Sequence, residues 1–290
     1  RRGEQLGCGE GTDAIGGASL DVPPVLDLGR EDRPPSPFFK HFPRMRGEIV
    51  LRALCSCLLI LVATGCGRYF PGDLQPRPES EQGEHMVVHD DGSVAYVFER
   101  LDIALRPMTD AELNRSFAAQ SANGALSTNP FTFGDWTPPG ESHTPQRFTI
   151  FLLRVKNYAY PKVKIDPSRI ELRSTSERLY KPLKFLEVSE YYRAHALAWA
   201  GNFYARMRER EDLLRRHMYA DKMVFSGQEY EGFLVFPPMP PDVTELAISV
   251  NDVAVRFNYT DGPVETVDLT YGFRRDVFKG YQPPATVSAR

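Results

Sequence analysis

The chain has no cysteine after residue 66. Its four cysteines are Cys8, Cys55, Cys57 and Cys66, all in the N-terminal part of the 290-residue sequence. The residues that follow can therefore form no intramolecular disulfide, and they offer no thiolate as a nucleophile or as a zinc ligand. Any chemistry performed by the larger, C-terminal part must use other side chains.

The chain also lacks a surplus of charge of either sign. It carries 35 Lys and Arg against 38 Asp and Glu, for a formal net charge of −3. No basic excess indicates a nucleic-acid partner, and no long acidic run indicates a solvating tail. Nucleic acid is therefore not a partner that we expect. The hydrophobic content of 42% predicts that at least part of the chain folds around a core.

The most hydrophobic run is too short to cross a membrane. Residues 53–65 are uncharged, and as a helix they would span roughly 20 Å, less than the hydrocarbon core of about 30 Å. A signal peptide needs only about 7–15 apolar residues after a positively charged start. Met45 is the first methionine of the chain, and Arg46 and Arg52 supply the positive charge. The pattern predicts a signal peptide over residues 45–65.

The run ends in the residues ATGC, with Cys66 last, and this ending resembles the lipobox of bacterial lipoproteins. In that family small residues precede a cysteine whose thiol receives a diacylglyceryl group. The signal is then cut before the cysteine, and the new N-terminus is usually acylated. Ala63 stands where the family prefers leucine. The resemblance covers residues 45–66 and implies that acyl chains on Cys66 attach the protein to a membrane of the bacterial cell envelope, facing the periplasm or the cell surface. A plain secretory signal is the alternative.

The segments on either side of the signal peptide show no regular pattern. Residues 1–44 contain no methionine, so we expect translation to begin at Met45 and this segment to be a mis-assigned upstream extension; a disordered extension is the alternative. Residues 66–93 are expected to be the lipidated cysteine and a flexible tether, because residues 67–85 are rich in Pro, Gly and Glu and would span about 25 Å as a flexible coil. Residues 276–290 are expected to be a frayed C-terminal tail. Gly67 is not the aspartate that marks inner-membrane retention in some bacteria, which favours the outer membrane.

Strand patterns dominate residues 94–275. Seven or eight short segments alternate apolar and polar residues or are apolar throughout, and residues 147–157 are apolar on both faces, as in a central strand. Little of the chain has the rhythm of parallel βαβ units. The predicted fold class is therefore mainly β, an antiparallel sandwich. One long helical insertion is expected at residues 188–218. Its apolar stripe, which includes Tyr192, is expected to pack on the sheet.

The segments FTIFLLRVKN and GFLVFPPMPPDVTELAISV resemble immunoglobulin-like domains of bacterial envelope lipoproteins of unknown function. That resemblance implies an immunoglobulin-like sandwich over residues 94–275. It carries no catalytic residue across to this chain.

Signatures of enzymes are missing. The sequence has no G-x-S-x-G, H-E-x-x-H, G-x-x-x-x-G-K-[ST] or G-x-G-x-x-G motif. Residues 85–91, HMVVHDD, contain metal-ligating side-chain types at a spacing that matches no specific site. Glu229 and Glu231 share one strand face, and we interpret them as charges that protect an edge strand. We therefore expect no catalytic residue, no metal and no cofactor.

The long loop between residues 120 and 146 carries the one binding candidate. Phe131, Phe133 and Trp136 lie within six residues and are flanked by prolines. Such a cluster is typical of an exposed patch that contacts an envelope protein or a glycan. Alternatively, the three rings pin the loop to the sandwich.

Taken together, the sequence predicts a lipid-anchored cell-envelope protein whose sandwich has a structural or binding role without catalysis. Two alternatives stay open at this point. One is a periplasmic hydrolase or metal-dependent enzyme whose site is assembled from distant residues. The other is a subunit of an envelope assembly that uses the helical stripe around Tyr192, Trp199 and Phe203 as its interface.

Overall fold

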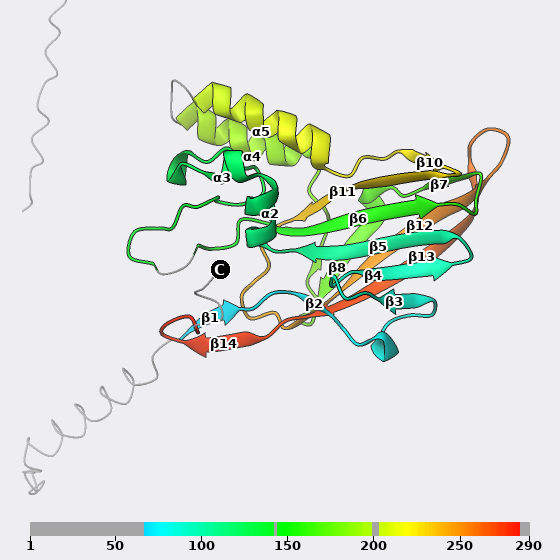
Figure 1. Cartoon of the computed structure of the whole chain (residues 1–290), viewed down its shortest axis with the longest axis horizontal. Coiled ribbons are helices and arrows are strands. Elements are labelled where there is room, and N and C mark those ends of the chain that lie inside the picture. Colours follow the sequence, from blue (N-terminus) through cyan, green and yellow to red (C-terminus); the bar gives the residue numbers. More distant parts are fainter. Residues whose placement is uncertain (1–66, 142–143, 199–202, 285–290) are drawn as a thin grey trace, which may run out of the picture. The chain divides into compact units, whose positions relative to one another are not determined.

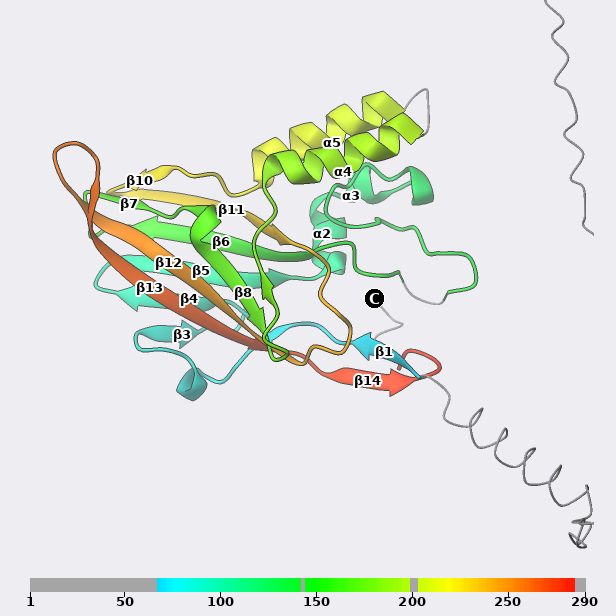
Figure 2. The same cartoon turned by 180° about the vertical axis from the view of Figure 1, so that it is seen from behind.

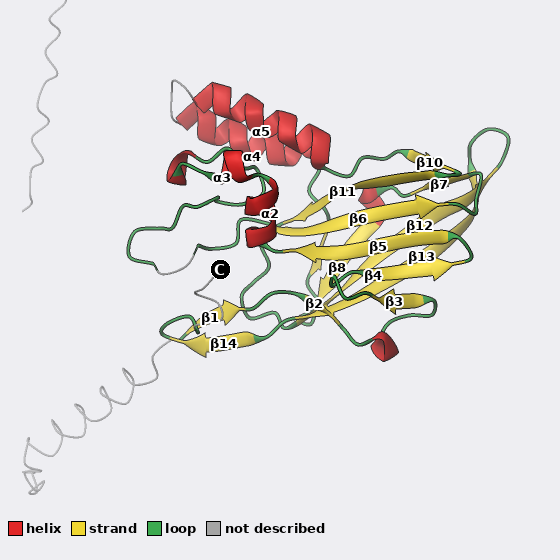
Figure 3. Ribbon diagram, viewed as in Figure 1, coloured by secondary structure: helices red, strands yellow, loops and turns green. Residues whose placement is uncertain are grey.

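The computed structural model describes residues 67–141, 144–198 and 203–284 of the chain. The expected upstream extension, the signal peptide and Cys66 lie outside the described residues, so what the sequence predicts for them stays a prediction. The described residues belong to one compact unit. This unit is mainly β, with a few helices (Figure 3).

Two antiparallel sheets pack face to face as a sandwich (Figures 1 and 2). The first sheet contains, in spatial order, β11 (Gln228–Phe236), β6 (Thr149–Asn157), β5 (Leu101–Met108), β4 (Val94–Phe98) and β3 (Met86–Val88). The second contains β10 (Met223–Phe225), β7 (Lys162–Lys164), β12 (Glu245–Phe257), β13 (Pro263–Arg274) and β2 (Gln75–Pro76), with β8 (Ile170–Ser174) and β9 (Leu179–Tyr180) joined to β12. The mainly β, antiparallel, sandwich-like fold expected from the sequence is confirmed.

Alternating side chains fill the space between the two sheets. On β6, Phe151 and Leu153 are buried in this core, whereas Ile150 faces the opposite side of its sheet. Strand β6 pairs with β5 along one edge and with β11 along the other, so the predicted central strand is confirmed. A hydrogen bond crosses the core, because the hydroxyl of Tyr271 donates to the main-chain oxygen of Ile103 at 2.9 Å. Without this bond, burying the hydroxyl would be costly.

Helices pack on the outer face of the first sheet at one end, where β5 ends and β6 begins (Figure 1). They are α2 (Asp110–Ser116), α3 (Ala118–Ser121), α4 (Phe185–Ala198) and α5 (Phe203–His217). Tyr192 of α4 and Leu214 of α5 are buried in a second apolar cluster with Ile150 and Val235 of the sheet. The predicted packing is therefore confirmed, although the insertion consists of two helices. None of the described helices is both long and apolar enough to span a bilayer.

The chain that leaves α5 is fixed to the edge of β11. The amide of Tyr219 donates to the main-chain oxygen of Phe233 at 2.9 Å. A Cβ atom on Gly232 would lie 2.6 Å from the Cα atom of Tyr219, so only glycine permits this close approach. The crossing covers part of a strand edge that would otherwise be open to pairing with another chain.

The flexible tether expected over residues 66–93 is not observed in its described part. Strands β1 (Arg68–Pro71), β2 and β3 all fall within it. The side chain of Gln82 acts as a substitute for a strand, because its Nε2 donates to the oxygen of Gly272 at 2.9 Å and its Oε1 accepts from the amide of Gly272 at 2.9 Å. The prediction was wrong because hydrogen bonds to residues almost 200 positions away, which leave no local pattern, hold this segment.

The frayed tail expected over residues 276–290 is also wrong in its described part. Strand β14 (Val277–Gly280) pairs with β1 in an antiparallel two-stranded ribbon that is separate from both main sheets. The amide of Gly72 extends the ribbon by donating to the oxygen of Asp276 at 2.8 Å. The two ends of the described chain thus close on each other, and the folded unit is longer than the predicted 94–275.

Candidate functional site

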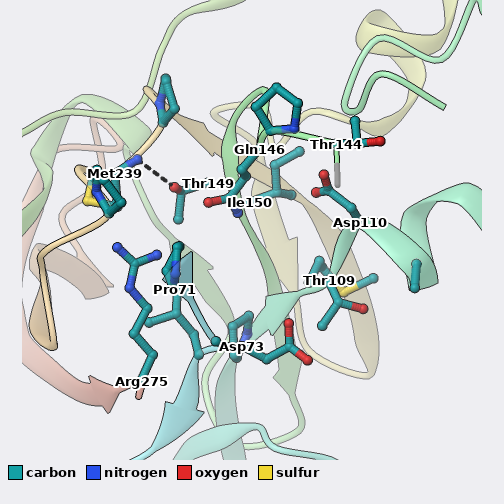
Figure 4. A pocket seen from close by; sticks show the side chains of 18 of the residues that line it. Pro71, Asp73, Thr109, Asp110, Thr144, Gln146, Thr149, Ile150, Met239 and Arg275 are labelled. Atoms are coloured by element: carbon teal, nitrogen blue, oxygen red, sulfur yellow. Dashed lines mark hydrogen bonds between the residues drawn. The ribbon is translucent and has the colours of Figure 1, made fainter. Parts of the chain in front are cut away.

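A cavity of about 490 Å³ lies where β5 ends and β6 begins (Figure 4). Its wall is built from six separate pieces of the chain, one of which is Gly134 in the long loop before β6. The other five are the segment from β1 to Leu74, the junction of β5 with α2, the start of β6 with the residues before it, the loop after β11, and Arg275 between β13 and β14. A volume of this size suits a small organic molecule. The ribbon that the sequence did not predict is therefore part of the site.

Arg275 fixes one side of the cavity. The side chain is 7% exposed, and it donates from Nε to the oxygen of Val243 at 2.7 Å and from Nη2 to the oxygen of Pro240 at 2.6 Å. The hydroxyl of Thr149 accepts from the amide of Met239 at 3.2 Å in the same loop (Figure 4). Burial lowers the pKa of Arg275, an effect that the charge of Asp242 opposes. These bonds hold the proline-rich loop 237–241 as a fixed wall.

Asp110 is the first residue of α2, and its carboxyl group is not needed to cap that helix. The sequence Thr109-Asp110-Ala111-Glu112 has the pattern of a capping box, and the box forms. Thr109 accepts from the amide of Glu112 at 3.2 Å, and Glu112 accepts from the amide of Thr109 at 3.0 Å. The side chain of Asp110 lines the cavity instead (Figure 4). Burial and the negative charge of Asp73 raise the pKa of Asp110 to about 7, against the opposing effect of Arg147. Asp110 therefore exchanges between its neutral and charged forms near neutral pH.

The two carboxyl groups and the guanidinium lie on different sides of the cavity. Asp73 and Asp110 lie on one side, and Arg275 lies on the other (Figure 4). Ile150 and Met239 are among the apolar residues that complete the wall. Two guanidinium nitrogens of Arg275 bond to carbonyl oxygens of the loop, and the two carboxyl groups give the opposite side its negative charge. The wall therefore suits a small molecule with an apolar body and a positively charged group.

Phe131, the first ring of the aromatic loop, is a structural residue and is not part of an exposed patch. Phe131 is fully buried, with ring centroids 5.1 Å from Phe233 and 5.4 Å from Phe117. The prediction that it belongs to a contact patch is wrong, since its ring fills the space between α2 and the sheet. Phe133 and Trp136 are partly buried, and the Arg147 guanidinium lies 3.9 Å from the centre of the Phe133 ring. The rings thus pin the loop to the fold.

Asn114 organises the same loop and also lines the cavity. Its Nδ2 donates to the oxygen of Gly134 at 3.1 Å, and its Oδ1 accepts from the hydroxyls of Thr132 at 2.5 Å and Ser121 at 3.2 Å. Gly134 has φ +66, and a Cβ there would lie 2.3 Å from the oxygen of Ser121. Only glycine fits this position. The loop conformation therefore supports one wall of the cavity.

The remaining candidates from the sequence lie away from the cavity. Within the described part of the chain, no group of three or more His, Cys, Asp or Glu side chains could hold a metal ion. In the segment 85–91, His85 packs edge-on against Phe98, with ring centroids 5.0 Å apart. Asp91 accepts from the amide of Ser93 at 3.0 Å. These metal-ligating side-chain types therefore make separate local contacts. Glu229 lies on edge strand β11 and accepts from the hydroxyl of Tyr158 at 3.0 Å.

Tyr192 of the helical stripe is not exposed for contact with a partner. Its side chain is 2% exposed, donates to the oxygen of Pro130 at 2.8 Å and accepts from Nη1 of Arg147 at 2.9 Å. Trp199 and the side chain of Phe203 lie outside the described residues. The alternative of an assembly interface is therefore wrong for Tyr192, which joins α4 to the loop before Phe131.

Comparison with protein-family models, with curated proteins and with solved structures returned no match. The immunoglobulin-like resemblance therefore stays a prediction, and the interpretation of the site rests on its own geometry. Sequence reasoning missed Asp73, Asp110 and Arg275. It placed them in a tether, in a capping motif and at the predicted end of the domain. No linear motif joins them, because folding brings the three positions together.

Proposed function

We propose that this chain is a lipid-anchored protein of the bacterial cell envelope whose sandwich binds a small ligand and performs no chemistry on it. The observation that carries the binding role is the cavity, with its fixed wall and its two carboxyl groups. The ending of residues 45–66 supports the anchor. Gly67 supports placement in the outer membrane rather than the inner one.

The ligand that the cavity favours is a small amphiphile with a cationic group. Asp73 and Asp110 supply negative charge on one side, and Ile150 and Met239 supply apolar surface. Burial of the Asp110 carboxyl group strengthens its attraction for a cation when it is charged. A cation beside Asp110 favours the charged form of its carboxyl group, so binding should tighten as the pH rises through about 7.

The anchor has a direct test. When the chain is expressed from Met45 in a bacterium, we expect the membrane fraction to contain it and its intact mass to include acyl chains on Cys66. The Cys66→Ala variant should lose both the lipid mass and the membrane attachment. Wild-type protein without lipid mass, or a variant that stays attached, would overturn the anchor.

The binding role is tested with two probes of similar shape and opposite charge. At pH 8, benzylamine should shift the amide resonances of cavity residues such as Asp110 and Ile150 in NMR spectra, and benzoate should shift them much less. The Asp110→Asn variant should weaken benzylamine binding roughly tenfold, the effect of about 1.4 kcal/mol. Glu231→Gln, an exposed carboxylate outside the cavity, is the matched control. Equal responses to both probes would contradict the proposed ligand class.

A second candidate function is favoured by one observation. A carboxyl group with a pKa of about 7 beside a second carboxyl group is suited to general acid–base chemistry, as in a hydrolase. The two functions differ in what Asp110→Asn removes. If the protein is a hydrolase, turnover of its substrate should depend on a group that titrates near pH 7 and should be lost in this variant, whereas a binding protein leaves the bound molecule chemically unchanged.

A further inference from the structure

The ribbon of β1 and β14 has one end that lies next to Cys66 in the chain. Its register pairs Arg68 with Gly280, so the start of β1 and the end of β14 are at the same end of the ribbon. Figure 1 shows the ribbon beside the sandwich, outside its two main sheets. We name the residues at this end the ribbon tip, and they are Arg68, Tyr69, Phe278, Lys279 and Tyr281.

The ribbon tip exposes three aromatic rings. Tyr69 is 43% exposed, Phe278 is 40% exposed and Tyr281 is 78% exposed. The ammonium group of Lys279 lies 5.5 Å from the centre of the Tyr69 ring, on the same face of the ribbon. Arg68 forms an ion pair with Glu141 at 2.7 Å, so Lys279 is the basic residue of the tip on which attraction to anionic headgroups depends. Tyrosine and lysine side chains side by side are typical of the boundary between a membrane and water.

The chain between Cys66 and the ribbon tip is very short. Arg68, where β1 begins, is the second residue after Cys66. Two extended residues reach at most about 7 Å. Acyl chains on Cys66 would enter the hydrocarbon core, which holds the cysteine at the level of the lipid headgroups. The start of β1 cannot then be far from that layer.

We propose that the ribbon tip is a membrane-contact surface whose exposed rings and Lys279 dock into the headgroup layer of the membrane that holds Cys66. This inference rests on the proposed lipidation. The occupant is a phospholipid surface, because the short connection brings lipid to the tip and Lys279 complements anionic headgroups. The acyl chains hold the protein on the bilayer, and the rings add contacts that orient the domain.

Docking at this surface would also place the cavity next to the lipid. Tyr69 belongs to the ribbon tip and also lines the cavity, as do the next five residues up to Leu74. A ribbon held in the headgroup layer would therefore keep the cavity beside the membrane. An amphiphilic ligand would reach it along the membrane surface.

The test uses the lipidated chain, expressed from Met45, in vesicles of phosphatidylethanolamine and phosphatidylglycerol with or without brominated phosphatidylcholine. Tryptophan is introduced in the Phe278→Trp and Tyr281→Trp variants, and the parent supplies the background from Trp136 and Trp199. The matched control is Tyr259→Trp. Tyr259 is 99% exposed in the turn between β12 and β13, at the other end of the sandwich (Figure 1). We expect bromine to remove roughly half of the added emission of the two ribbon variants, since interfacial side chains lie about 5–10 Å deep, and to leave the control unchanged.

Two results would overturn the inference, and they are distinguishable. Intact mass could show acyl chains on Cys66, with flotation of the protein on the vesicles, while the ribbon variants are quenched no more than the Tyr259→Trp control. The anchor would then stand, and the membrane-contact surface would fall. Alternatively, absence of lipid mass would remove the proposed anchor itself, together with the inference that rests on it.

Discussion

The middle of the sandwich and its cavity end bury polar groups in different ways. In the middle the core is apolar, and the hydroxyl of Tyr271 is satisfied by the oxygen of Ile103 on the facing sheet. At the cavity end Arg275 is withdrawn from water and is held by main-chain oxygens, while Asp110 has a pKa of about 7. Ionisable groups in such surroundings cost stability. The same chain builds a dry core elsewhere, so we interpret the cavity end as the part shaped for function.

The largest predicted effect is a loss of stability on substitution of Arg275 that substitution of its neighbour Arg274 does not cause. Arg275→Met removes two hydrogen bonds from a buried cation and leaves the oxygens of Pro240 and Val243 without that donor. We expect the free energy of unfolding to fall by about 2 kcal/mol. Arg274→Met, at the exposed position next to it, should change that energy by no more than about 0.5 kcal/mol. Urea denaturation measures both. Equal losses would remove the distinction between the cavity end and the surface.

Substitution of Asp110 should have a smaller effect of opposite sign, a gain in the free energy of unfolding. Its pKa is raised from 3.8 to about 7 in the folded protein, so the stability it confers is complete below about pH 4 and is lost as the pH rises to about 7. Asp110→Asn should remove this decline and should be more stable than the parent at pH 8. The gain should be roughly 1–2 kcal/mol, below the full value of about 1.4 kcal/mol per pKa unit because Asp110 is partly exposed.

Denaturation curves at pH 4 and pH 8 provide the measurement, with Glu231→Gln as the control carboxylate. If the parent and the Asp110→Asn variant depend on pH in the same way, Asp110 does not titrate in the cavity as described.

The smallest effect should come from the middle of the sandwich. Tyr271→Phe removes the bond to the oxygen of Ile103 and keeps the ring in place. We expect a loss of about 1 kcal/mol in the free energy of unfolding, without a change in benzylamine binding. Tyr259→Phe, at a 99% exposed position, is the control and should have no effect. Weaker benzylamine binding in the Tyr271→Phe variant would show that the middle and the cavity end are not independent.

Elements with a local pattern could be predicted from the sequence. Strand β6 has apolar residues facing two covered sides, and the start of α2 carries a capping box within four residues, from Thr109 to Glu112. Each depends on neighbours in the sequence, so composition and spacing are sufficient. The apolar stripe around Tyr192 likewise predicted packing on the sheet.

The ribbon and the cavity could not be predicted in this way. Strands β1 and β14 have four residues each, too few to show a period, and their partners lie at opposite ends of the folded unit. Asp73, Asp110 and Arg275 meet only after the sheets and the ribbon have formed. Phe131 was misassigned because an aromatic residue in a proline-rich loop has the same sequence pattern whether it is exposed or buried.

The most direct test of the account is a titration of Asp110 in the free protein. The carboxyl carbon of Asp110 can be followed by NMR between pH 3 and pH 9 in protein labelled with ¹³C-aspartate, and the resonance is assigned as the one missing from the Asp110→Asn variant. The account predicts a midpoint near pH 7, set by burial and by the charge of Asp73. A midpoint near the ordinary value of 3.8 would show that Asp110 faces bulk water, and it would contradict a cavity built to hold a charged ligand.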